Sequence, residues 1–240
     1  MAYQDFTDYT EVDASSKVTV TSSKVSWANQ VADETAYTYY DFGTDNFDGS
    51  FIFSFNCRME DASTTSFYPA LVSLTNSVED LAALLGDYLG YAQYVSWRNG
   101  SQNFFIDHIT SRTQHVAVGT ALSFLTVYYM KFTRDNSVGT YGTLYLDVYS
   151  TSSLRDAGSA GDGDEDTISL TLTEITKFRY LYVCQSYNNG TSTFKGTGYV
   201  ENLDIDAGGS TGYTKTVNGV ETPAKINGIA VANIGKFNGV

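Results

Sequence analysis

The feature that most constrains this chain is a two-residue alternation of apolar and polar side chains that recurs along most of its length. In FIFSFNCRME (51–60), an apolar side chain occupies every second position from Phe51 to Met59, and most residues between them are polar. Successive side chains of a β-strand point to opposite faces, so this pattern predicts a strand with one face in a core. TVYYMKFTRD (126–135) and TLYLDVYS (143–150) repeat the pattern on either side of a glycine-containing loop, which predicts a hairpin.

About a dozen short runs of this kind are present, among them RYLYVCQS (179–186) and GYVENLDID (198–206). Aromatic residues make up 15% of the 240 residues, and tyrosine and phenylalanine favour pleated, half-buried surfaces. Only SVEDLAALLGDYLG (77–90) has helical spacing, which predicts one short helix or an extended loop. The sequence therefore predicts an all-β protein, built as a sandwich or a barrel.

The charge balance excludes some partners. With 27 acidic and 14 basic residues, the net charge of −13 repels phosphate backbones and anionic lipids, so we expect no nucleic-acid partner. No apolar run approaches the ~18 residues of a membrane span, so we expect no membrane insertion. The first residues, MAYQDFTDYTEVD, lack the basic region and apolar core of a secretory signal. We therefore expect synthesis in a cytoplasm.

Several segments, taken in order, resemble a known superfamily. They are DFTDYTEVD (5–13), AYTYYDFG (36–43) with FDGSFIFSF (47–55), the hairpin region 125–150, and KFRYLYVCQSYNNG (177–190) with GTGYVENLDID (196–206). They are similar to the concanavalin A-like lectin/glucanase superfamily, and more narrowly to laminin-G-like modules of tailed-phage and metagenomic viral proteins. The resemblance covers residues 5–206 and implies an antiparallel two-sheet β-sandwich, a jelly roll with one concave sheet.

The chain is expected to consist of a sandwich (1–207), a Gly/Ser linker (208–212) and an apolar tail (213–240). The tail repeats Asn-Gly at 218–219, 227–228 and 238–239, and the first two copies fit type I′ hairpins. One residue follows the last copy, which therefore cannot close a hairpin. We expect docking or oligomerisation through the tail's apolar residues, with folding back onto the sandwich as the alternative; these residues are Ile226, Ile229, Val231, Ile234 and Phe237.

Two predicted loops carry the residue types of a sugar-binding site, which are an aromatic face and polar groups that bond hydroxyls. The first group consists of Tyr91, Tyr94, Trp97, Arg98 and Asn99, and the second of Tyr187, Asn188 and Asn189. The alternative is that these are ordinary surface aromatics beside Asn-Gly turns.

The acidic run from Asp162 to Asp166 is predicted to be a solvated loop. Calcium at Asp162, Asp164 and Asp166 is the alternative, because the superfamily often binds calcium, but the Gly and Glu of an EF-hand loop are missing. No other cofactor is expected. Cys57 and Cys184 have no metal-ligand spacing and are expected to be buried free thiols, with a disulfide as the alternative.

Laminarinase-type relatives carry two catalytic glutamates four residues apart on one strand. Here the position four before Asp206 is Asn202, and Glu201 is expected to point away from Asp204, since it lies three positions before it. A bulge near Asn202 could bring Glu201 to the same face, but nothing in the sequence requires one. The sequence therefore predicts that the chain is not an enzyme.

Three functions compete. We expect a virion structural or accessory protein of a tailed phage (a head decoration, head fibre or tail-associated module), located in the virion and forming homo-oligomers or binding other virion proteins. The alternative is an adhesin that recognises host-surface glycan, and a glycoside hydrolase is the least favoured.

Overall fold

The computed structural model describes residues 3–31, 34–43, 46–60, 68–78, 91–98, 101–110, 113–187, 195–206, 225–226 and 229–230. The chain divides into two compact units, unit 1 (Met1–Ala207) and unit 2 (Gly208–Val240). The segment 79–90, which carries most of the predicted helix or loop, lies outside the described residues.

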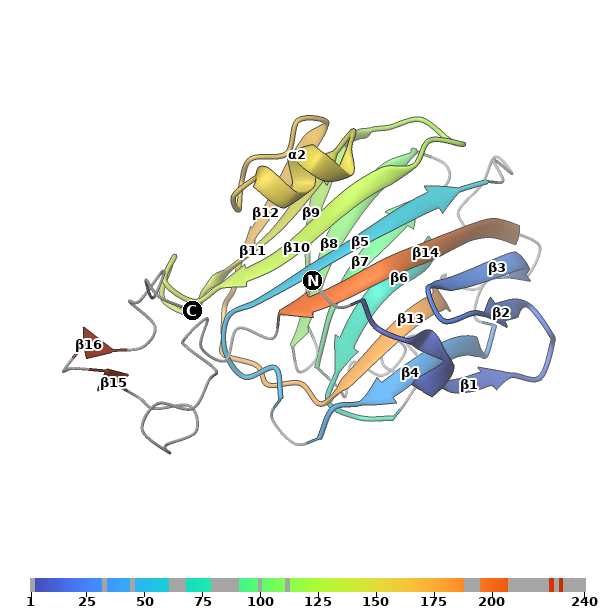
Figure 1. Ribbon diagram of the computed structural model, residues 1–240, viewed down its shortest axis with the longest axis horizontal. Helices are drawn as coiled ribbons and strands as arrows, with labels where there is room; N and C mark the ends of the chain where they lie inside the picture. The colour runs from blue at the N-terminus through green and yellow to red at the C-terminus, as the bar shows by residue number, and fades with distance from the viewer. Residues whose placement is uncertain are drawn as a thin grey trace. The chain divides into compact units, whose positions relative to one another are not determined.

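Unit 1 consists of two antiparallel seven-stranded sheets stacked as a sandwich, so the predicted fold class is confirmed (Figure 1). Sheet 1 has the order β1 (Thr10–Asp13), β4 (Ala36–Asp41), β13 (Tyr180–Tyr187), β6 (Tyr68–Thr75), β7 (Ala92–Arg98), β8 (Asn103–Thr110) and β9 (Thr113–Ala121). Sheet 2 has the order β12 (Asp166–Thr171), β11 (Thr143–Tyr149), β10 (Tyr128–Asp135), β5 (Phe51–Met59), β14 (Lys195–Asp206), β3 (Lys24–Val31) and β2 (Val18–Val20).

The core lies between the inner faces of the sheets, where the alternation in the sequence places the apolar side chains. Every second residue of β5 from Phe51 to Met59 is buried there, and the predicted hairpin is confirmed because β10 pairs with β11. Phe53 pairs with Phe132 of β10, and the rings of Phe51 and Phe53 stack 4.7 Å apart. Burying each phenylalanine contributes about 1.5–3 kcal/mol, so this stripe anchors the two central strands.

Polar side chains also enter the interior near one end of the sandwich. Gln93 donates from Nε2 to Thr176 Oγ1 (3.2 Å) and lies 3.3 Å from His108 Nδ1, while Arg134 Nη1 donates to the Thr176 carbonyl (2.7 Å). His108 and Arg134 are fully buried. Burial, with smaller contributions from His115 and Arg134, lowers the pKa of His108 to about 4, so this histidine is neutral at pH 7.

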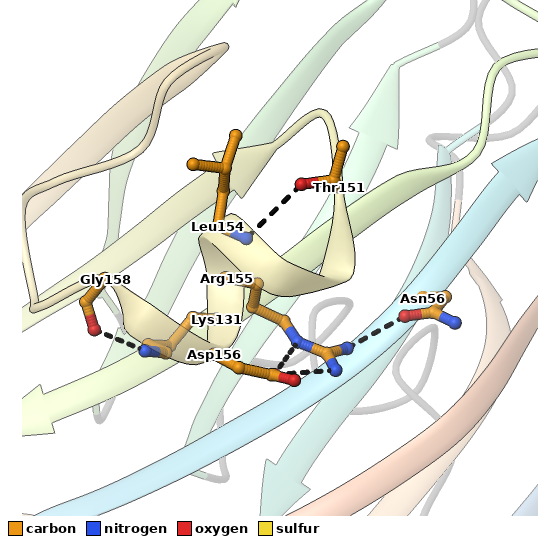
Figure 2. A network of polar contacts seen from close by, with 7 residues as sticks. All are labelled: Asn56, Lys131, Thr151, Leu154, Arg155, Asp156 and Gly158. Atoms are coloured by element: carbon orange, nitrogen blue, oxygen red, sulfur yellow. Dashed lines mark hydrogen bonds and ion pairs between the residues drawn. The ribbon is translucent and has the colours of Figure 1, made fainter.

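A short helix, α2 (Ser152–Ala157), lies on the outer face of sheet 2, where the sequence predicts none (Figures 1 and 2). Thr151 caps it, since its Oγ1 accepts a hydrogen bond from the Leu154 amide (3.3 Å). Arg155 reaches down to the sheet and donates from Nη1 to Asn56 Oδ1 of β5 (2.8 Å), and Lys131 Nζ donates to the Gly158 carbonyl (2.6 Å). These contacts hold the helix on β5 and β10.

In unit 2, β15 (Lys225–Ile226) pairs with β16 (Ile229–Ala230), with Ile226 opposite Ile229. This confirms the predicted hairpin around Asn227-Gly228. The hairpin predicted around 218–219 and the last copy at 238–239 lie outside the described residues. Within the described residues, no helix has the length and apolar character needed to cross a membrane.

Candidate functional site

The structure moves the centre of the first predicted sugar site into the protein. Trp97 is fully buried on the inner face of β7, where its ring packs edge-on against Phe104 (4.6 Å). β7 continues to Arg98, so Trp97 belongs to the strand and not to a turn. Because its side chain lies on the inner face of that strand, it faces the core and cannot stack on a sugar. Placing Trp97 in a surface turn was therefore wrong. Asn99 lies outside the described residues.

Two tyrosines of that predicted site occupy different places. Tyr91 packs against the core, and its amide donates to Asn76 Oδ1 (3.3 Å). Tyr94 is on the outer face of sheet 1, between Ser73 and Asp107 of the neighbouring strands, and its hydroxyl accepts a hydrogen bond from Gln114 (3.3 Å). Tyr94 is 1% exposed, so it offers no surface to a ligand in this structure.

In the second predicted sugar site, Tyr187 ends β13, while Asn188 and Asn189 lie outside the described residues. The docking residues Ile226 and Ile229 lie in the β15–β16 hairpin, and the docking residues Val231, Ile234 and Phe237 fall outside the described part of the tail.

The acidic loop does not bring its carboxylates together as a cation site. Asp164 accepts hydrogen bonds from the Ser150 amide and hydroxyl, Asp166 from the Thr120 amide, and Asp162 from the Ser159 amide. Each carboxylate thus fastens a different piece of backbone. Among the described residues, no three His, Cys, Asp or Glu side chains are grouped as metal ligands. The arrangement gives no support to calcium at these three aspartates.

Cys57 and Cys184 are both buried and free, as expected. Burial raises the pKa of both thiols, so they are not poised as nucleophiles.

A pocket that the sequence did not point to lies where the N-terminal segment packs beside the end of β4. We call it the acidic–aromatic pocket; its volume is about 280 Å³, and it is lined by Gln4, Asp5, Asp8, Tyr9, Tyr40, Asp41 and Phe42. Two anchors place the segment: the Gln4 amide donates to the Leu203 carbonyl (2.7 Å), and the Phe6 amide donates to the Ser22 carbonyl (3.0 Å). Residues Phe6–Asp8 then form one 3₁₀ turn, η1, which Asp5 caps through the Thr7 amide.

The aromatic wall of the pocket comes from packing of distant segments. Phe6 of η1 is fully buried and holds Tyr9 edge-on at 5.2 Å. Tyr9 packs against Tyr40 of β4 at 5.3 Å, and Tyr40 packs edge-on against Phe42 at 4.7 Å. Tyr9 is 8% exposed and lines the pocket, while its hydroxyl oxygen is buried and has no hydrogen-bond partner among the described residues. The phenol is neutral, because burial raises its pKa.

Three carboxylates give the pocket its charge. Arg179 donates to both oxygens of Asp41 (2.7 and 2.6 Å), and this ion pair lowers the pKa of Asp41 and neutralises its charge. The Thr7 hydroxyl and amide lower the pKa of Asp5, so it is ionised at neutral pH. Asp8 is exposed and makes no side-chain hydrogen bond within the described part of the chain. Asp5 and Asp8 therefore leave the pocket with negative charge.

The sequence holds a weak signal for this site. DFTDY places Asp5 and Asp8 on either side of one turn, and in YYDF the aromatic residues Tyr40 and Phe42 flank Asp41. Neither stretch shows that the two will meet, because Tyr40 lies 31 positions after Tyr9 in the chain (40 − 9 = 31).

The closing strand differs from the expectation in one respect. Asn202 has a positive φ of 55°, and the register of β14 against β5 shifts between Glu201 and Asp204. Because this bulge inserts one residue, Glu201 (opposite Asn56) and Asp204 (opposite Ser54) share the outer face of sheet 2. Predicting that Glu201 points away from Asp204 was wrong. Glu201 forms an ion pair with Lys24 (3.1 Å).

No protein-family model matches the sequence, and no curated protein does either. The fold is similar to several solved structures at low identity. An endo-β-1,4-glucuronan lyase from the fungus Trichoderma reesei is 11% identical, with a TM-score of 0.49, over 82% of this chain and 85% of the lyase. The binding domain of a botulinum neurotoxin DC in complex with SialylT is 9% identical (TM-score 0.48; 77% of this chain, 38% of that one).

A sialidase from Trypanosoma rangeli is 8% identical, with a TM-score of 0.46, and the match covers 80% of this chain. The match spans 26% of the sialidase's length. At these identities the likeness shows the fold alone, a β-sandwich of the jelly-roll kind.

The prediction that the chain is not an enzyme is contradicted. Solved structures with this fold include a sialidase and a polysaccharide lyase, so the sandwich does not place the chain outside the enzymes. The argument from the closing strand also fails, since the bulge brings Glu201 and Asp204 to one face. Fold-level similarity leaves the enzyme status of this chain unresolved.

Proposed function

We propose that unit 1 binds carbohydrate in the acidic–aromatic pocket. The observation that carries the proposal is that one hollow combines the rings of Tyr9, Tyr40 and Phe42 with hydrogen-bonding carboxylates. An aromatic ring packs against the apolar face of a sugar ring, while carboxylate oxygens accept hydrogen bonds from its hydroxyls. The volume of about 280 Å³ is at the small end of ligand pockets, which suits one or two sugar units of a longer glycan.

A glycan array and titrations followed by NMR test this proposal with Tyr40→Leu, which keeps apolar bulk against the core but removes the stacking face. We expect about a five- to tenfold loss of affinity, because stacking on one ring contributes on the order of 1–1.5 kcal/mol. Tyr145→Leu is the matched control, since Tyr145 is a half-buried tyrosine on the outer face of sheet 2. An array with no signal above background for the wild-type protein would reject carbohydrate binding.

A second candidate function is attachment to a virus particle through unit 2, as the phage resemblance of the sequence suggests. The observation in its favour is the β15–β16 hairpin, which forms at one of the tail's Asn-Gly repeats within a unit separate from the sandwich. We propose that the tail docks on a second copy or on another virion protein, and that glycan binding serves recognition of a host surface.

Deleting residues 213–240 tests this attachment. A truncated protein that keeps its melting temperature but loses its oligomeric state or its association with particles supports docking. A fall in melting temperature would show instead that the tail stabilises its own sandwich. Mass spectrometry of purified particles shows independently whether the protein is a virion component.

A further inference from the structure

We propose that the acidic–aromatic pocket selects saccharides that carry a free amino group over N-acetylated, neutral and acidic ones. This inference rests on the proposed carbohydrate binding and specifies its ligand class. It follows from which charges in the pocket are already paired and from the aromatic side chains that line it.

The first step concerns the charges. Arg179 is the cation beside the pocket, and two of its three donating nitrogens, Nε and Nη2, donate to Asp41. The Arg179 guanidinium also lies 5.1 Å from the ring of Tyr180, which keeps it on the outer side of β4. Asp5 and Asp8 have no basic partner in the described part of the chain. An acidic sugar would meet unpaired carboxylates, whereas a protonated amine would pair with them.

The second step concerns the aromatic side chains that line the pocket. A cation is also attracted to the face of an aromatic ring, and Tyr9, Tyr40 and Phe42 line the same hollow as the two carboxylates. An ammonium group thus finds carboxylate and aromatic surfaces together. An N-acetyl group offers no charge to either surface, although its sugar ring can still stack.

Calorimetric titration with tetramers of glucosamine, N-acetylglucosamine, glucose and glucuronic acid tests the proposal, because these sugars differ mainly in one substituent. We expect the glucosamine tetramer to bind about tenfold more tightly than the N-acetylglucosamine and glucose tetramers, as one charge-assisted hydrogen bond would provide. Salt should weaken the binding of the glucosamine tetramer and leave that of the glucose tetramer unchanged.

Two variants assign the preference to the pocket. Asp8→Asn should lower affinity for the glucosamine tetramer about tenfold and should lower affinity for the glucose tetramer less, because the amide oxygen still accepts a hydrogen bond from a hydroxyl but carries no charge. Glu11→Gln is the matched control, since Glu11 is an exposed carboxylate on β1 that does not line the pocket.

The outcomes separate the two proposals. Equal affinity for the glucosamine, N-acetylglucosamine and glucose tetramers would overturn the amine preference while leaving carbohydrate binding in place. No binding of any tetramer would overturn both. A simple alkylamine that binds as tightly as the glucosamine tetramer would overturn the saccharide part.

Discussion

Replacing Arg155 with alanine removes the side chain that fastens α2 to the outer face of sheet 2 (Figure 2). Arg155 is 1% exposed, and its guanidinium donates to Asn56 Oδ1 at 2.8 Å and to the neighbouring Asp156 at 2.9 Å. Asn56 is 7% exposed, so its carbonyl oxygen would lose a buried charged donor and regain little water.

The expected loss is the sum of unequal contributions. A hydrogen bond to a charged group contributes about 1.5–3 kcal/mol, and the buried stem contributes about 0.8 kcal/mol for each methylene. The ion pair with Asp156 adds at most about 1 kcal/mol, since the Asp156 side chain is 40% exposed. Returning the guanidinium to water offsets part of this sum. We expect a net loss of about 3 kcal/mol, or roughly 6–12 °C in melting temperature for a unit of this size.

Urea denaturation followed by tryptophan fluorescence measures this loss in unit 1, because both tryptophans, Trp27 and Trp97, are buried in the sandwich. Asp156→Asn is the control for the exposed ion pair and should cost less than about 1 kcal/mol. A double-mutant cycle with Asn56→Ala should give a coupling energy above about 1 kcal/mol. A loss in Arg155→Ala no larger than that in Asp156→Asn would refute the reasoning.

Two further predictions concern the interior and the closing strand. His108 has a folded-state pKa of about 4 against an ordinary value of 6.5, so the folded state binds fewer protons, and stability is complete above pH 6.5 and falls as the pH drops toward 4. The full loss in the free energy of unfolding is roughly 3 kcal/mol. In urea titrations at a series of pH values, His108→Gln should make the free energy of unfolding depend less on pH in this range. An unchanged slope of that free energy against pH would contradict the prediction. At Asn202, where φ is 55°, Asn202→Val should cost about 1–3 kcal/mol in the same assay, whereas Asn202→Gly should be nearly neutral. Equal losses in both variants would show that the backbone conformation is not the cause.

Much of the fold follows from the sequence because side-chain alternation has a direct physical consequence in a strand. The stripe from Phe51 to Met59 and the hairpin of β10 and β11 could be predicted, since burial of one face is the dominant favourable term in each. The Asn-Gly hairpin at β15–β16 follows from turn chemistry in the same local way. Arg155 and its helix could not be predicted, because six residues carry little helical signal and the hydrogen bond to Asn56 spans 99 residues.

Most of the candidate site could not be predicted from the sequence. The Asn99-Gly100 pair is typical of a turn, which is why the sequence predicts Trp97 in a surface loop, but β7 continues to Arg98 and buries Trp97. A one-residue bulge at Asn202 places the side chains of Glu201 and Asp204 on the same face of sheet 2, and no residue pattern in the sequence requires this bulge. The sequence by itself determined the strands, the buried stripes and the acidic character of the protein. Only the tertiary structure brought Asp5, Asp8 and Tyr9 beside Tyr40 and Asp41, because long-range packing rather than local propensity decides which segments meet.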